Sequence, residues 1–163
     1  MRTTVATFVR RDGSKIKLDS DPYAIMKGYR QIRLNDKEAG GILLGRMIEN
    51  SNDVIIDEIT VPGLLDKRNR FSFIRSKFVQ SIIFKKWRTS KHTKNYLGEW
   101  HTHPESQPSP SGTDLKDWAN ILRKGRFEQN YLIFIIVGQV MISAWEFHKD
   151  DSEPYLLHLQ DQP

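Results

Sequence analysis

Apolar runs bounded by turn residues predict five strands along the chain. Three of them are Gly41–Ile48, Val54–Val61 and Tyr96–His103. Two further runs, "YLIFIIVG" and "VMISAWEF", flank a tight connection at Gly138-Gln139. These last two strands are therefore expected to form a β-hairpin. The tail "EPYLLHLQDQP" is expected either to add an edge strand or to lack regular structure.

Helical spacing and capping residues predict three helices between these strands. The first begins at Asp19-Ser20-Asp21-Pro22, which combines a capping side chain with a first-turn proline, and runs to about Leu34. The second spans roughly Ile74–Thr89, and the third begins at Ser111 and ends near Gly125. The predicted strands and helices are interspersed along the chain, and two of the strands form a hairpin. This pattern favours an α/β (mixed α+β) domain whose mixed sheet is flanked by helices.

Length and composition are typical of one globular domain. The chain has 163 residues, of which 38% are hydrophobic and 28% charged, so a single domain over 1–163 is expected. The longest apolar runs are too short to cross a bilayer, and the first residues lack the apolar core of a signal peptide. We therefore expect a cytoplasmic protein that does not enter a membrane. The chain contains no cysteine, which excludes disulfides, thiolate metal sites and cysteine nucleophiles within it.

A basic cluster accounts for much of the formal charge of +5. Its members are Lys85, Lys86, Arg88, Lys91 and Lys94. Such a cluster is typical of the solvated face of a helix, and the alternatives are binding to nucleic acid or to an acidic protein. No nucleic-acid-binding motif accompanies it, so nucleic acid is not an expected partner. A steep salt dependence of DNA binding would reveal phosphate contacts.

The segment "HTHPESQPSPSGTD" concentrates residues that can bind a metal. On a strand, His101 and His103 point to the same face and Thr102 points to the other. Asp114 falls in the first turn of the helix that begins at Ser111, where the helix dipole favours the ionised carboxylate. Two imidazoles and one carboxylate, with a fourth position left for water, are typical of a catalytic zinc site.

A structural interpretation of the same residues also stands. A single His-x-His is weak evidence for a metal, and Ser111 followed three residues later by Asp114 fits a capping box. The conjunction of His-x-His, seven residues and Ser-x-x-Asp is far more specific than either half.

This conjunction resembles the signature H-x-H-x(7)-S-x-x-D of the JAMM (JAB1/MPN/Mov34) metalloproteases. The family also carries an upstream E-x-x-G-x-L-x-G, which "EAGGILLG" at Glu38–Gly45 matches in full. The resemblance covers about Pro22 to Phe147. It implies a largely antiparallel mixed sheet between helices, in the MPN/JAB fold that is similar to cytidine deaminase. It also implies one zinc ion per chain and hydrolysis of peptide or isopeptide bonds after ubiquitin-like C-termini.

The resemblance assigns a role to each motif residue. His101, His103 and Asp114 resemble the zinc ligands. Ser111 resembles the residue that orients water and steadies the oxyanion, and Glu38 resembles the general acid/base. Glu99 is an alternative base, because it shares the strand face of the two histidines. It could instead accept a hydrogen bond from an imidazole N–H.

The stretch "LGEWHTHPESQPSPSGTD", in a short chain without cysteines, is similar to the prokaryotic branch of the family. Small members of that branch accompany ubiquitin-like activating and conjugating enzymes in anti-phage operons, including CBASS. The resemblance therefore implies removal of a ubiquitin-like or cGAS-like nucleotidyltransferase (CD-NTase) tail from its conjugates, with those enzymes as partners. Two alternatives remain open: a protease that trims a sulfur-carrier precursor, and a non-catalytic MPN interaction module.

Overall fold

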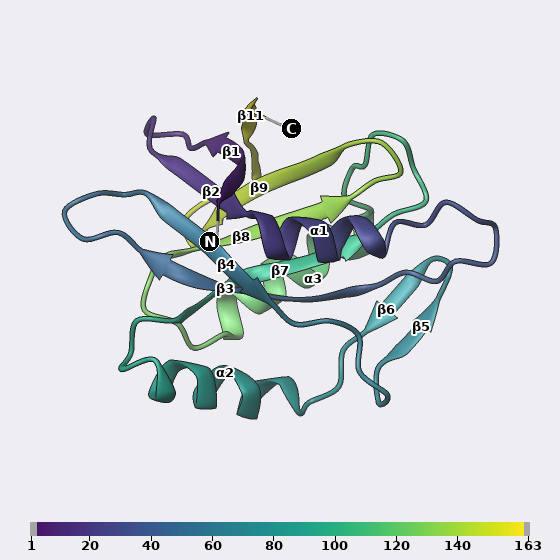
Figure 1. The fold of residues 1–163 in the computed structure, drawn as a ribbon, viewed down its shortest axis with the longest axis horizontal. Helices are drawn as coiled ribbons and strands as arrows, with labels where there is room; N and C mark the ends of the chain where they lie inside the picture. The colour runs from purple at the N-terminus through teal and green to yellow at the C-terminus, as the bar shows by residue number, and fades with distance from the viewer. Residues whose placement is uncertain (1–2, 162–163) are drawn as a thin grey trace.

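The computed structural model describes residues 3–161, in which strands dominate and helices cover the sheet (Figure 1). The elements in chain order are β1 (Thr4–Val9), β2 (Lys15–Asp19), α1 (Ser20–Gly28), β3 (Gly40–Met47), β4 (Val54–Ile59), β5 (Lys67–Asn69), β6 (Ser72–Ile74), α2 (Val79–Thr89), β7 (Asn95–Thr102), α3 (Gly112–Lys124), β8 (Tyr131–Val137), β9 (Ile142–His148), β10 (Tyr155–Leu156) and β11 (His158–Asp161).

Nine strands form one mixed sheet in the order β10-β9-β8-β7-β3-β4-β2-β1-β11. The pairs β2–β4 and β7–β8 are parallel and the other pairs are antiparallel. The C-terminal segment pairs with β9 through β10 and with β1 through β11. Because one short segment contacts both edges, the sheet is nearly closed. The strand β7 lies near its centre, between β3 and β8.

The alternation of side chains along β8 separates two cores. Ile133, Ile135 and Val137 pack in one cluster with residues of α1, whereas Leu132, Phe134 and Ile136 pack in the other with Trp118 and Leu122 of α3. Helices α1 and α3 therefore cover opposite faces of the sheet. Helix α2 contributes Val79 to a smaller cluster with Ile42 and Leu44 of β3.

Most predicted elements are confirmed, within one or two residues for the strands. The strands over residues 41–48, 54–61 and 96–103 correspond to β3, β4 and β7, and the predicted hairpin is β8–β9. The third helix is α3, which begins directly after its cap Ser111. The tail forms β10 and β11, and its last two residues lie outside the described part of the chain. The expected mixed α+β class, with a mostly antiparallel sheet, is confirmed.

Two helix boundaries were predicted wrongly. The first helix ends at Gly28 and not at Leu34, because the next segment turns inward and buries Gln31 completely. The second begins at Val79, since the residues from Lys67 to Ile74 form the hairpin β5–β6. The pairing of β1 with β2 was not predicted at all.

None of the helices within residues 3–161 is long and apolar enough to cross a membrane.

Candidate functional site

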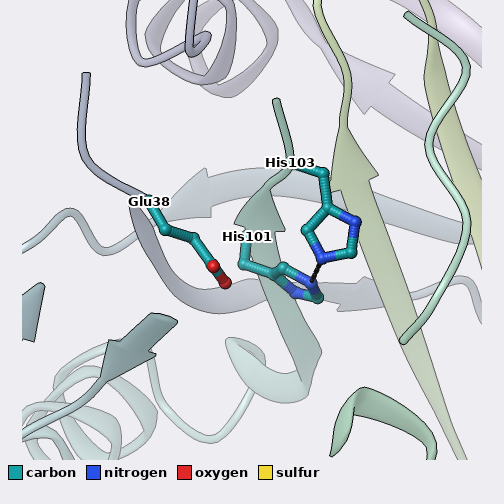
Figure 2. Close-up of side chains that lie close together, drawn as sticks. All are labelled: Glu38, His101 and His103. Carbon is teal, nitrogen blue, oxygen red and sulfur yellow. Dashed lines mark hydrogen bonds between the residues drawn. The ribbon is translucent and has the colours of Figure 1, made fainter. Parts of the chain in front are cut away.

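Strand β7 and the residue after it bring two imidazoles together. His101 lies opposite Gly40 of β3 and Ile136 of β8, so neighbours on both sides fix its backbone. The backbone N–H of His103 donates to the carbonyl of Val137 at 3.0 Å. Both side chains are buried, and their Nε2 atoms lie 3.1 Å apart (Figure 2). The expectation that the two rings share a face is confirmed.

Asp114 reaches both imidazoles from the first turn of α3. Its Oδ1 lies 3.3 Å from Nε2 of His101, and its Oδ2 lies 3.1 Å from Nε2 of His103. The same carboxylate accepts the Ser111 backbone N–H at 2.8 Å, and the Ser111 hydroxyl oxygen accepts the Asp114 N–H at 3.1 Å. The capping box and the convergence on the histidines are therefore not alternatives. The cap holds the carboxylate where the imidazoles meet it.

Glu38 approaches from the segment before β3, and its carboxylate points toward His101 (Figure 2). The backbone of Glu38 is fixed by the β5–β6 hairpin, because its N–H donates to Asn69 and its carbonyl accepts from Arg68 Nε. One ligand atom each from Glu38, His101 and His103 lie within 4.8 Å of one another. Burial raises the pKa of Glu38 to about 7, although the two imidazoles oppose the shift. A carboxylate tuned in this way can both take and return a proton near neutral pH.

The charges of the other site residues follow from their contacts. Burial alone would raise the pKa of Asp114, but hydrogen bonds with His101 and His103 hold it well below its ordinary value. Burial lowers the pKa of His103, yet the Asp114 carboxylate outweighs it and the net shift is upward. The carboxyl group of Asp114 is therefore ionised, and the ionised form is the one that binds a cation.

The donor set fits a metal such as zinc. Two ligand atoms at 2.0–2.1 Å from one zinc ion in tetrahedral geometry lie about 3.3–3.4 Å apart. The contacts among His101 Nε2, His103 Nε2 and the Asp114 oxygens measure 3.1–3.3 Å. Two imidazole nitrogens that face each other so closely also need a shared cation or proton between them. The buried Glu38 carboxylate stands beside this set and has no hydrogen bond of its own among the described residues.

Glu99 is directed to other partners. It lines the same cavity as Glu38, His101 and Asp114. Its carboxylate, however, forms an ion pair with Arg75, and it accepts a hydrogen bond from the Tyr96 hydroxyl at 3.4 Å.

One supporting network was not predicted from the sequence. The Thr102 hydroxyl oxygen accepts the Ala39 N–H at 2.9 Å and donates to the Gln31 side chain at 2.8 Å. Gln31 in turn donates to the carbonyl of Arg70 at 2.7 Å. The network ties the residue after Glu38 to the strand that carries the histidines. Gln31 gave no signal because it lay within a segment predicted to be helical.

The glycines of "EAGGILLG" have a packing reason. A Cβ on Gly41 would collide with the carbonyl of Thr60, and a Cβ on Gly45 would collide with the carbonyl of Ile55. The absence of a Cβ at both positions lets β4 and the residue after it approach β3 at backbone distance. The glycines of the motif therefore set how closely β3 packs against the strand that follows it.

The chain has relatives among known proteins. The model of the family described as prokaryotic homologs of the JAB domain matches residues 29–148. A protein of Pseudomonas aeruginosa named CD-NTase/cGAS isopeptidase is 41% identical over 106 residues, which are 64% of this chain and 65% of that protein. An Escherichia coli protein of the same name is 31% identical over 152 residues, which are 93% of this chain and 94% of that protein.

A further relative and one solved structure extend the likeness. A Sinorhizobium fredii protein named as a probable metalloprotease is 34% identical over 93 residues, 56% of each chain. The solution structure of a Desulfitobacterium hafniense protein matches with a TM-score of 0.58 and 21% identity, over 91% of both chains. That structure shares the fold with this chain.

Proposed function

The chain belongs to the family of prokaryotic homologs of the JAB domain, and we propose that it is a zinc-dependent isopeptidase. The observation that carries the proposal is the convergence of His101, His103 and Asp114 beside the buried carboxylate of Glu38. A non-catalytic MPN module would have no need for this complete set. The relatives named isopeptidase and metalloprotease support the same activity.

We assign the residues as follows. His101, His103 and Asp114 hold the ion, Glu38 is the general acid/base, and Ser111 orients the water and the oxyanion. When bound, zinc supplies Lewis acidity that polarises the scissile carbonyl and makes water acidic near neutral pH.

The protein side chains then move the protons. Glu38, with its pKa raised to about 7 by burial, accepts the proton of the attacking water. The same carboxyl group returns that proton to the leaving amine, which departs as a neutral group. The Ser111 hydroxyl oxygen is engaged by the Asp114 N–H, so its own proton is free to be donated toward the developing oxyanion.

The substrate we propose is the C-terminal tail of a ubiquitin-like or CD-NTase protein conjugated to a target. The support is the similarity, at 31–41% identity, to relatives named CD-NTase/cGAS isopeptidase. The role that follows is deconjugation in CBASS anti-phage signalling, next to activating and conjugating enzymes. The proposed location is the cytoplasm, where such conjugates would form.

Within the mixed α+β class, we propose that the chain has the cytidine-deaminase-like arrangement and that residues 1–163 form a single domain. The support is that β1, β2 and β11, near the two ends of the chain, belong to the same sheet as β3 and β7.

Elemental analysis and a tail fusion test the proposed function together. The purified protein should hold one zinc per chain and should cleave a fusion of the candidate tail to a reporter directly after the last tail residue, as read by mass spectrometry. Replacing both His101 and His103 with Ala should remove metal and cleavage together. Full activity in protein shown to be free of metal, or cleavage within the folded reporter, would contradict the proposal.

A further inference from the structure

The cavity that contains the candidate site continues into a second cavity between α2 and α3. The first has a volume of about 490 Å³ and the second about 270 Å³. They share four lining residues, which are Arg75, Gln80, Asn120 and Ile121. A polypeptide whose scissile bond lies at the metal site therefore has a continuous path into the second cavity. We call this path the α2–α3 groove.

The charge of the lining changes along the α2–α3 groove. Around the site the carboxylates of the lining outnumber its cations, Arg75 and Lys77; the carboxylates belong to Glu38, Glu99, Asp114 and Asp117. In the second cavity the charged lining residues are Arg75, Lys124 and Arg126, and no carboxylate lines it. An extended chain that enters the groove thus passes from an acidic region, which a cation at the site would neutralise, to a basic one.

Two of the three cations are available to a ligand. Arg75 forms an ion pair with Glu99, whereas Lys124 and Arg126 are exposed and form no ion pair with another residue in the range 3–161. The loop that carries Arg126 is held in place, because Gly125 N–H donates to Ile121 at 2.7 Å and Gln129 donates to the carbonyl of Tyr96 at 2.8 Å. The backbone that carries Arg126 is therefore held in a defined position.

We propose that the α2–α3 groove selects substrate tails that carry acidic side chains upstream of the scissile bond. The inference rests on the proposed isopeptidase function and names its substrate class. The occupant is the tail and not the target, because an isopeptide target presents one lysine side chain from a folded surface. Only the tail supplies a run of extended residues long enough to follow a groove beyond the site.

The size of the effect follows from exposed ion pairs. Each such pair contributes a factor of about 1.4 to 5 in binding, so two pairs together contribute a factor of roughly 2 to 25. The acidic tail should have a lower KM and an unchanged kcat. The reason is that the contacts are remote from the reacting atoms and are the same in the ground state and the transition state. It should also weaken as salt rises, since exposed charges are screened.

The experiment compares two fusions with identical reporter and identical last residues, one with glutamates and one with lysines at the upstream tail positions. The zinc-loaded wild type should cleave the acidic tail with a kcat/KM roughly 2- to 25-fold higher, and the difference should shrink at high salt. The double variant K124E/R126E should prefer the lysine tail.

A matched control lies on the same helix. Lys116 and Arg123 are exposed residues of α3 that line neither cavity, and Arg123 shares the last turn with Lys124. K116E/R123E therefore makes the same change of net charge, with a similar cost to the helix dipole, and should keep the wild-type preference. Thermal melting of both double variants shows whether each is folded.

The outcomes separate the two proposals. If the wild type cleaves both tails equally well, or if both double variants alter the preference alike, the groove inference is overturned and the isopeptidase function stands. A preference that follows acidic residues placed after the scissile bond overturns it as well. If the zinc-loaded wild type cleaves neither tail, the proposed function fails, and the groove inference fails with it.

Discussion

Replacing Glu38 with Gln tests the assignment of the proton-transfer group with little change in shape. The side chain is 6% exposed, and the substitution keeps its volume while removing the basic carboxylate. General acid–base catalysis contributes about 10²–10⁴ in rate, so kcat should fall by that factor. Bound zinc and the melting temperature should change little, because Glu38 is assigned outside the ligand set.

Glu99→Gln is the matched control for this substitution. Glu99 lines the same cavity but forms an ion pair with Arg75 and accepts a hydrogen bond from Tyr96. Glu99→Gln should lower kcat/KM only a few-fold, because Arg75 loses its ion pair with Glu99 and is held less firmly. The assay is cleavage of a tail fusion under saturating and limiting substrate, with zinc measured on the same samples.

The pH profile gives the second measurement for Glu38. Burial raises its pKa to about 7, and the base must be ionised to accept a proton from water. Activity should therefore rise with pH through about 7, and the residual activity of Glu38→Gln should lack this rise. A large loss in Glu99→Gln with a small loss in Glu38→Gln would exchange the two roles, and a wild-type rate that does not change with pH would refute the proton-transfer argument.

Three further predictions concern the metal and the stability of the fold. A chelator should abolish cleavage and zinc should restore it, while circular dichroism shows a folded protein throughout, because the chain has its own core. Glu146→Gln should destabilise by about 3–5 kcal/mol in denaturant unfolding, since it leaves the buried Arg10 without its carboxylate. Burial alone would raise the pKa of Glu146, but hydrogen bonds from the Arg11 backbone, His148 and Arg10 hold it below its ordinary value. The stability difference between the wild type and Glu146→Gln should therefore shrink as pH falls through that lowered pKa. Gly45→Ala should destabilise by about 1–3 kcal/mol because its Cβ meets the carbonyl of Ile55, whereas Gly28→Ala, with open space around it, should not.

The parts of the fold that sequence predicted well are those governed by local rules. Strand β8 is a continuous apolar run, β9 is a largely apolar run on the other side of a turn, and α3 begins after a side chain that caps it. The end of α1 was missed because tertiary contacts determine it: Gln31 is drawn into a buried network with Thr102. The strands β5 and β6 are only three residues each and were not predicted, and Ile74, the last residue of β6, was predicted to begin the second helix.

The sequence predicted the proximity of some candidate site residues but not of all of them. Strand alternation predicted that His101 and His103 share a face, and the capping pattern placed Asp114 in the first turn of α3. The apolar strand that follows Glu38 indicated partial burial, but nothing local to Glu38 placed its carboxylate beside the two histidines. That depends on β3 pairing with β7 and on the backbone contacts of the β5–β6 hairpin, which are long-range features. The residues of the α2–α3 groove likewise come from two helices and a loop.

The capping box and the proposed metal site share Asp114, and this has a physical advantage that explains why one short motif can specify both. A carboxylate that binds a cation must lose side-chain freedom, and this costs free energy unless another contact has already ordered it. In Asp114 the Ser111 N–H provides that contact at 2.8 Å, and the dipole of α3 favours the ionised form at the same position. The helix start thus orders and charges the ligand before any ion arrives. Ser111→Ala would keep the backbone N–H that orders the carboxylate but would remove the hydroxyl that accepts the Asp114 N–H. It should therefore lower helix stability and turnover, whereas Ser111→Asp, a good cap without a hydroxyl, should preserve the helix and lose turnover. Loss of turnover in Ser111→Ala with restored turnover in Ser111→Asp would show that the serine acts through the cap alone.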